Sequence, residues 1–349
     1  MRWKTTLVLL VATVGIGAYL SLYEIRQPSP EERTRLSTQV VKVVPQRVTH
    51  IVLDLPQAKL TLVRRPKAGW EIAPQRFRAD AAQVEPLLQA MAPLMAERVL
   101  AESAQHPLDV KSFGLDPAIG WISVVNGEAP ITLWIGETTA VKGNRYARIN
   151  GRSEVFVISS RLFDEANQPL ERFRDHVLMR VDPWQADTLR MTTPAASYHL
   201  TRTDNTWRIA SATPVPLDDV ADRTEVNGLL GALGAITIAQ FMDDAPQVEH
   251  LADWGFDEPK AELTLTYGGQ AKRTTTVFVG KPLAENPAQL YAKRSDEPAL
   301  YAVSSAEVEG VLKLLQTSLD QLRPPAPPSQ PAPSSSSVQG PAQPTVHTK

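Results

Sequence analysis

The apolar residues of this chain fall into short alternating runs, and the runs recur in the same order in its second half. Gly, Asn and Pro separate the runs, which is typical of strands joined by turns. In the first half the runs predict strands at 51–55, 59–63, 69–72, 122–125, 131–136, 145–149 and 155–159. In the second half they predict strands at 263–267, 275–280, 290–293 and 300–304.

Each half also contains one helix-like stripe that begins after an aspartate. Asp80 and Asp222 are 142 positions apart, and Gln83 or Glu225 follows three residues later, which is the pattern of a helix N-cap. Pro86 and Pro93 predict a kink or an early end of the first helix. The apolar positions at helical spacing are Val84, Leu87, Leu88, Met91 and Leu94 in the first half, and Val226, Leu229, Leu230, Leu233 and Ile236 in the second.

A turn sequence is repeated as well. Phe113-Gly114-Leu115-Asp116-Pro117 has a close copy in Trp254-Gly255-Phe256-Asp257-Glu258-Pro259, which carries one inserted residue. Gly enters the positive-φ region without steric cost, and the residue before a Pro prefers extended geometry. We interpret both segments as turns that lead into strands, and the alternative is a catalytic role for Asp116 and Asp257.

These matches predict two tandem copies of one α+β domain with mainly antiparallel sheets, at residues 40–180 and 181–323. The residues expected to carry the structural signature are Trp70, Asp80, Gly114, Asp116, Pro117, Gly136, Tyr146, Arg174, Asp175, Trp207, Asp222, Gly255, Asp257, Pro259, Gly280 and Tyr291.

The N-terminal segment is predicted to cross a membrane. Arg2 and Lys4 precede an uncharged run over residues 5–23, and such a helix reaches about 28 Å, the thickness of a bilayer's hydrocarbon core. Residues 1–26 are therefore expected to form a signal anchor in the bacterial cytoplasmic membrane, with the N-terminus cytoplasmic and the bulk of the chain periplasmic or otherwise extracytoplasmic. A cleaved signal peptide is the alternative, although no small-x-small site follows the run.

Two segments are too polar to form a core. Residues 27–39 are predicted to be a solvated stalk, and residues 324–349, rich in Pro and Ser, a disordered tail. Docking of this tail into an aromatic groove is the alternative, because Pro-rich segments bind such grooves.

Composition excludes several function classes. The net charge of -2 gives no reason to expect a nucleic-acid partner, and the absence of Cys excludes disulfides, Cys-ligated zinc and a thiol nucleophile. The six His are not at metal-ligand spacing, and no familiar catalytic or phosphate-binding motif occurs. No catalytic, cofactor or metal residue is therefore predicted.

Charge distinguishes the two halves. Residues 47–176 contain 16 basic and 15 acidic residues, whereas residues 185–323 contain 12 and 19, which suggests surfaces presented to different neighbours. The run 172–176 is interpreted as an exposed helix end, or alternatively as an anion site. Arg145, Arg148 and Arg152 fit the polar face of a strand, or alternatively a site for phosphate or an acidic sugar.

The chain resembles the bacterial domain-of-unknown-function family 4340. The resemblance rests on the single predicted span, Gly-Trp-Glu-Ile at 69–72, Asp80, the Phe-Gly-Leu-Asp-Pro turn, Ile-Gly before a Tyr-Ala-Arg strand, and Leu-Glu-Arg-Phe-Arg-Asp at 170–175. It covers residues 48–323, but the second copy lacks the Arg-Asp pair at its end. Family members are often encoded beside ATP-driven exporters of the gliding-motility type, which implies an accessory role in the envelope.

The expected function is therefore that of a non-enzymatic envelope protein, an auxiliary component of an ABC-type export system whose two domains contact protein partners. One alternative is a periplasmic binding module for an envelope glycan, lipid or small ligand. The other is a hydrolase that uses Asp116 or Asp175.

Overall fold

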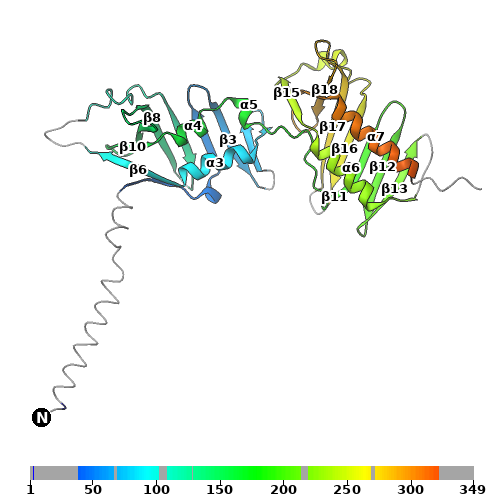
Figure 1. Ribbon diagram of the computed structural model, residues 1–349, viewed down its shortest axis with the longest axis horizontal. Helices are drawn as coiled ribbons and strands as arrows, with labels where there is room; N and C mark the ends of the chain where they lie inside the picture. Colours follow the sequence, from blue (N-terminus) through cyan, green and yellow to red (C-terminus); the bar gives the residue numbers. More distant parts are fainter. Residues whose placement is uncertain are drawn as a thin grey trace, which may run out of the picture. The chain divides into compact units, whose positions relative to one another are not determined.

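The computed structural model (Figure 1) describes Trp3 and residues 38–66, 69–101, 108–127, 129–213, 219–268 and 272–321. Within this described part, no helix has both the length and the apolar character that crossing a bilayer requires. The predicted anchor at residues 5–23, the stalk up to residue 37 and the tail at 324–349 lie outside the described residues.

The first sheet has ten strands in the order β1-β6-β10-β9-β8-β7-β2-β3-β4-β5. Its strands are β1 (Gln39–Lys42), β2 (His50–Asp54), β3 (Lys59–Arg65), β4 (Gly69–Ala73), β5 (Phe77–Arg78), β6 (Pro93–Leu100), β7 (Gly120–Val125), β8 (Pro130–Thr138), β9 (Asn144–Ile149) and β10 (Val155–Ser159). The associated helices are η2 (Pro45–Arg47), α3 (Ala81–Met91), α4 (Arg161–Ala166) and α5 (Leu170–Phe173). Figure 1 shows α3 crossing the strands. The residues that α3 buries are Val84, Leu87, Leu88 and Met91.

The second sheet has nine strands in the order β14-β13-β12-β11-β16-β17-β18-β19-β15. Its strands are β11 (Ala186–Thr192), β12 (Ser197–Thr203), β13 (Thr206–Thr213), β14 (Asp219–Val220), β15 (Ile238–Asp243), β16 (Ala261–Tyr267), β17 (Arg273–Pro282), β18 (Gln289–Arg294) and β19 (Leu300–Ser304). The helices are α6 (Arg223–Ala235), η3 (Val248–His250), η4 (Ala252–Trp254) and α7 (Ser305–Gln321). Read from the opposite end, the first sheet has this same order with β1 added, which confirms the internal repeat.

Equivalent residues make equivalent contacts in the two copies. Trp70 and Trp207 are buried on β4 and β13, and their carbonyls accept the backbone N–H of Ala79 and Ala221 at 2.8 and 2.9 Å. An arginine from the neighbouring strand covers each indole, at 4.7 Å for Arg64 on Trp70 and 5.8 Å for Arg202 on Trp207.

The helix caps repeat in the same way. The Asp80 carboxylate accepts the Ala82 N–H at 2.8 Å, and that of Asp222 accepts the N–H groups of Thr224 and Glu225 at 2.7 and 3.1 Å. These backbone hydrogen bonds hold the pKa of Asp222 below its ordinary value. The predicted N-caps are confirmed.

The repeated turns require their glycines. Gly114 and Gly255 have φ of +65° and +79°, and a Cβ on Gly255 would lie 2.9 Å from the Lys281 backbone nitrogen. The aromatic residue before each glycine packs on a tyrosine, with ring centroids 4.7 Å apart for Phe113 and Tyr146. The centroids of Trp254 and Tyr291 are 6.3 Å apart. Both segments precede strands, as predicted.

The first helix is shorter than its apolar stripe. It contains Pro86 but ends at Met91, and Leu94 lies in β6 rather than in the helix. Pro93 explains this end, because it has no N–H to donate to the carbonyl one turn before it.

The described residues divide into two compact units. Unit 1 comprises those within Met1–Leu178, Thr237–Trp254 and Tyr291–Ala302, and unit 2 comprises the remainder. This division differs from the predicted domains at 40–180 and 181–323, because β15, η3, η4 and most of β18 and β19 belong to unit 1.

Unit 1 buries an arginine between two aromatic rings. The guanidinium carbon of Arg174 lies 4.0 Å from the ring centre of Phe77 and 3.9 Å from that of Phe241, and the group pairs with Asp244. Arg174 is 2% exposed. Cation–π contacts of a desolvated guanidinium are worth about 2 kcal/mol.

A buried carboxylate lies in the same unit. Glu297 pairs with Arg294 at 2.5 Å, accepts the Arg78 backbone N–H at 3.1 Å and accepts the Tyr301 hydroxyl. Burial raises the pKa of the Glu297 carboxyl, although the Arg294 guanidinium acts in the opposite direction. This acid joins three separate parts of the unit.

The prediction that residues 172–176 form an exposed helix end is wrong for the central pair. Arg174 and Asp175 are buried, because α5 ends at Phe173 and the chain continues in an extended conformation. The Asp175 N–H then donates to the Arg78 carbonyl at 2.9 Å, and the Asp175 carboxylate lies 3.6 Å from the Arg78 Nε.

Replacing Gly136 tests the close approach between the turn and β8. A Cβ there would lie 2.3 Å from the Phe113 carbonyl oxygen, so Gly136→Ala is expected to lower the free energy of unfolding by about 1–3 kcal/mol in urea denaturation. The matched control is Gly231→Ala in α6, where the added Cβ meets nothing within 4 Å and should raise stability by up to about 1 kcal/mol. Equal effects of the two changes would contradict this description of the turn.

Removing Glu297 tests the buried charge pair. Glu297→Ala leaves Arg294 charged and buried, so we expect a loss of about 3–5 kcal/mol in the free energy of unfolding. Asp296 also lies 3.1 Å from Arg294, but the Asp296 side chain is 39% exposed. Asp296→Ala should therefore lower the free energy of unfolding by only about 0–1 kcal/mol. A comparable loss for both variants in thermal or urea denaturation would show that burial does not distinguish the two acids.

Candidate ligand-binding groove

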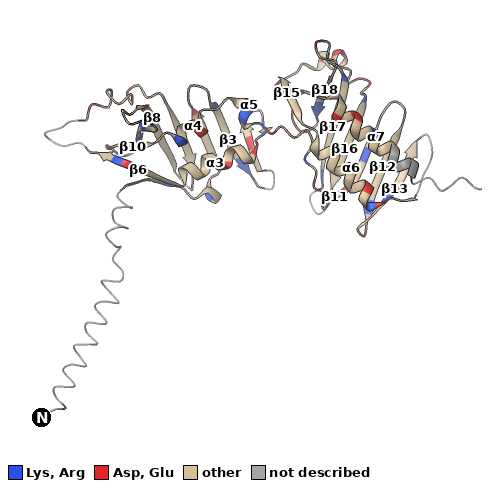
Figure 2. Cartoon of the chain, viewed as in Figure 1, with Lys and Arg blue, Asp and Glu red and all other residues tan. Residues whose placement is uncertain are grey.

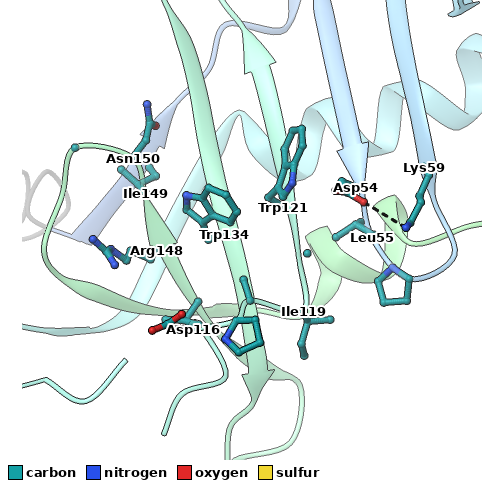
Figure 3. A pocket seen from close by; sticks show the side chains of 16 residues that line it. Asp54, Leu55, Lys59, Asp116, Ile119, Trp121, Trp134, Arg148, Ile149 and Asn150 are labelled. Carbon is teal, nitrogen blue, oxygen red and sulfur yellow. Dashed lines mark ion pairs between the residues drawn. The ribbon is translucent and has the colours of Figure 1, made fainter. Parts of the chain in front are cut away.

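A groove of about 660 Å³ lies in unit 1, where the central strands of the first sheet end or begin (Figure 3). Three connecting segments form it together with residues of the neighbouring strands: the turn after β2, the stretch that leads into β7, and the turn after β9. Its lining residues are Asp54, Leu55, Pro56, Lys59, Leu115, Asp116, Pro117, Ala118, Ile119, Gly120, Trp121, Trp134, Arg148, Ile149, Asn150 and Gly151.

Four of these residues form a row across adjacent strands. Asp54 on β2 is opposite Trp121 on β7, Trp121 is opposite Trp134 on β8, and Trp134 is opposite Arg148 on β9. Residues directly opposite each other project from the same face of a sheet. We call this set the Trp row.

The Trp row lies on the face that the core does not use. Each of Asp54, Trp121 and Trp134 has a chain neighbour that is at most 2% exposed; these neighbours are Leu53, Ile122 and Leu133. Trp134 itself is 40% exposed. Side chains alternate between faces along a strand, so burying the first set directs the Trp row to the opposite face.

The two indoles form an aromatic surface. Their ring centroids are 6.2 Å apart and their planes are tilted by 56°. Trp134 is exposed and Trp121 is half-buried, and adjacent indoles of this kind provide apolar area together with N–H donors, a combination that is enriched at binding surfaces.

The ends of the Trp row carry opposite charges. Figure 3 shows Asp54 beyond Trp121 and Arg148 beyond Trp134, with Asp116 at the edge below them. The Lys59 ammonium lies 3.9 Å from the Asp54 carboxylate, and both side chains are well exposed, at 77% and 48%. An exposed pair of this kind is weak, so either group remains available to a ligand.

Backbone contacts hold the floor of the groove in place. A Cβ on Gly120 would lie 2.3 Å from the Asp54 carbonyl oxygen, so only glycine lets β7 begin this close to the end of β2. The Ile119 N–H donates to the Ile135 carbonyl at 2.9 Å, which fixes the stretch against β8.

The second repeat lacks the aromatic pair. Phe278 precedes Gly280 by two positions, as Trp134 precedes Gly136, and the residue opposite Phe278 is Glu262. Thr192 is in turn opposite Glu262, where the first sheet has Asp54 opposite Trp121. The same architecture therefore carries a Trp pair in one copy and a Glu–Phe pair in the other.

The predicted signature residues divide between this groove and the framework. Asp116 and Pro117 line the groove, whereas Asp175 belongs to the buried charges of unit 1. Asp257 and Pro259 lie in the second turn, before β16. Gly136 and Gly280 are buried in β8 and β17, and Tyr146 and Tyr291 lie in β9 and β18.

The three basic residues of the first half have different surroundings. Arg148 reaches the groove, while Arg145 and Arg152 cover the rings of Phe163 and Phe156 at 3.8 and 5.1 Å. The interpretation of these arginines as a strand's polar face holds for Arg148, whose neighbours along β9 are buried.

Sequence reasoning missed Asp54, Trp121, Trp134 and Asn150. The available signal was the position of Trp134 in its run, between Leu133 and Ile135, where alternation places an aromatic residue on the solvent side. The pairing of Trp134 with Trp121 depends on strand register, which the sequence does not reveal.

The titratable residues of the groove are two carboxylates, one ammonium and one guanidinium, with no histidine among the lining side chains. Across the described ranges, no group of three His, Asp or Glu side chains is arranged to hold a metal ion.

Figure 2 shows that charged positions of both signs are distributed along loops, strands and helices of the described chain. The excess of acidic residues in the second half therefore does not come from one continuous block of acid side chains.

Comparison with known families identifies the repeat. A model described as a domain of unknown function (DUF4340) matches residues 70–219 and again residues 207–323. Searches of curated proteins and of solved structures gave no match. Because the two matches together cover most of the chain, this protein belongs to the DUF4340 family.

Proposed function

We propose that this protein is a non-enzymatic recognition protein of the cell envelope that binds a protein partner through the groove of unit 1. The observation that carries the proposal is the exposed Trp134, whose indole lies next to that of Trp121 on the open face of the sheet. Large aromatic residues exposed together on a folded domain mark interaction sites, and Trp is the residue that most often dominates binding energy.

Divergence between the repeats supports the same proposal. If the first sheet needed the Trp row only for stability, the second sheet would need an equivalent, yet it has Glu262 and Phe278 at these positions. The core-facing residues, in contrast, are apolar in both copies, as with Ile122 and Leu263. At the positions compared, the difference therefore falls on the face opposite the core.

The N-terminal sequence supports the proposed setting. Residues 5–23 would anchor the protein in the cytoplasmic membrane, with both units outside the cytoplasm. The resemblance to a family encoded beside exporter genes makes the subunits of an ABC-type export system the partners we propose.

A second candidate is recognition of an envelope glycan. The observation in its favour is that the side chains of Asp54, Asp116, Arg148 and Asn150 surround the indoles, and such polar groups can form hydrogen bonds with hydroxyls while the rings pack on an apolar sugar face. Saturable binding of envelope glycans to the purified protein, lost in Trp134→Ala, would favour this candidate over a protein partner.

Site-specific photo-crosslinking in native membranes tests the proposal. A photoreactive residue at Pro56, exposed in the turn after β2 at the edge of the groove, should yield a discrete product with another membrane or envelope protein. The matched control is Pro194, exposed in the equivalent turn between β11 and β12, which should yield none of that product.

The Trp row should control this product. Trp134→Ala is expected to reduce its yield at Pro56 at least tenfold, since an aromatic anchor typically contributes more than about 1.4 kcal/mol. Equal yields from Pro56 and Pro194, or a yield unaffected by Trp134→Ala, would contradict a groove-specific partner.

A further inference from the structure

We propose that this protein forms a two-fold symmetric dimer, in which α6 and α7 of one copy pack against α6 and α7 of a second copy. The surface involved is a groove of about 530 Å³ between these two helices, and all its lining residues belong to unit 2. Figure 1 shows α6 and α7 next to each other on the second sheet, and they are in contact. We call this surface the helix groove.

The helix groove is lined mainly by small or apolar residues. They are Ala232, Ala235 and Ile236 of α6 and Ala306, Gly310, Val311 and Leu314 of α7. Two charged residues, Glu307 and Lys313, complete the lining. The distance between packed helices depends on the side chains at the contact, so small residues let another helix come close. The helix groove therefore suits a helix as its occupant.

A large apolar side chain lies beside this groove. Leu314 is 43% exposed, whereas Val311 and Leu315 on the core side of the same helix are 2% and 3% exposed. In a two-fold interface both copies use the same patch, so a residue of one copy can fill a depression of the other and receive its equivalent in return. Leu314 of each copy thereby enters the helix groove of the other and leaves water.

Gly310 allows the two copies of α7 to cross closely. It lies in the interior of the 17-residue α7, where glycine is less favourable than alanine. A Cβ at this position would meet nothing within 4 Å among the described residues, so packing inside one copy does not require a glycine. A second α7 laid across this position does require it, because a side chain there would hold the helices apart.

The charges of the helix groove are self-complementary. Glu307 precedes Gly310 by three residues and Lys313 follows it by three, which places each about 4.5 Å from Gly310 along the helix axis. A two-fold axis that passes Gly310 at right angles to the line between these residues brings Glu307 of one copy to Lys313 of the other, twice per dimer. A partner surface with charge of a single sign would match only one of the two residues. A second copy matches both.

The first copy of the domain lacks this surface. The strands that precede α4 and α7 end at Ser159 and Ser304, and counting from them places Arg161 and Glu165 where α7 has Ala306 and Gly310. The Arg161 Nε lies 4.0 Å from the Glu165 carboxylate, and α4 ends one residue later. The long helix with its small residues is thus specific to the second copy and is not needed to complete the repeated architecture.

The first experiment measures the self-association of the purified full chain by sedimentation and light scattering. The wild-type chain should form dimers. Gly310→Leu and Leu314→Glu should each raise the dissociation constant at least tenfold, because one fills the crossing point and the other places a charge in the helix groove. Both positions are exposed, so the circular dichroism of the variants should match that of the wild type. The matched control is Glu85→Lys, exposed on α3 of the first copy, which should leave the dissociation constant unchanged.

Charge reversal identifies the partner as a second copy. Glu307→Lys and Lys313→Glu should each weaken self-association at low salt, because residues of like charge then meet across the interface. When the two variants are mixed, with one of them labelled, they should form a mixed dimer at least fivefold more tightly than either associates with itself. Every Glu–Lys pair is restored in the mixed dimer. A damaged fold does not produce this recovery.

Three results would each overturn the inference: a monomeric wild-type chain, self-association that Gly310→Leu leaves unchanged, or no recovery on mixing the two charge variants. The proposed function concerns only the groove of unit 1. Photo-crosslinking from Pro56 that depends on Trp134 would therefore stand even if the chain proved monomeric, so the two proposals can fail separately.

Discussion

The structure depends on the alternation of side chains along antiparallel strands. Burying Leu53, Ile122 and Leu133 on one face leaves Asp54, Trp121 and Trp134 on the other, and no local adjustment can move one set without the other. Strand register then brings residues from distant parts of the sequence into a single row. The groove is thus a direct product of the same pattern that forms the core.

Because the domain is duplicated, each structural feature of one copy can be compared with its equivalent in the other. The N-caps, the buried tryptophans under arginines and the glycine turns recur in both copies, so these residues serve the architecture. The Trp row does not recur. A framework kept in two copies with one altered open face is the arrangement expected when the copies contact different neighbours, and it agrees with the difference in their charge balance.

The sequence predicted the periodic parts of the fold. Strand runs, the caps at Asp80 and Asp222 and the turns at Gly114 and Gly255 are local signals, and the structure contains them. It did not predict the burial of Arg174, because an Arg-Asp pair at a helix end is usually exposed. The rings of Phe77 and Phe241 and the carboxylate of Asp244 make its burial favourable. The groove was also missed, because its residues come together only through the register of the paired strands.

The most direct test of the central claim is carbene footprinting of the protein in native membranes compared with the purified chain. The account predicts reduced labelling of Trp121 and Trp134 in membranes, with unchanged labelling of Thr192 and Phe278 on the equivalent face of the second sheet. Unchanged labelling of the two tryptophans, or protection of Thr192 and Phe278 instead, would contradict it.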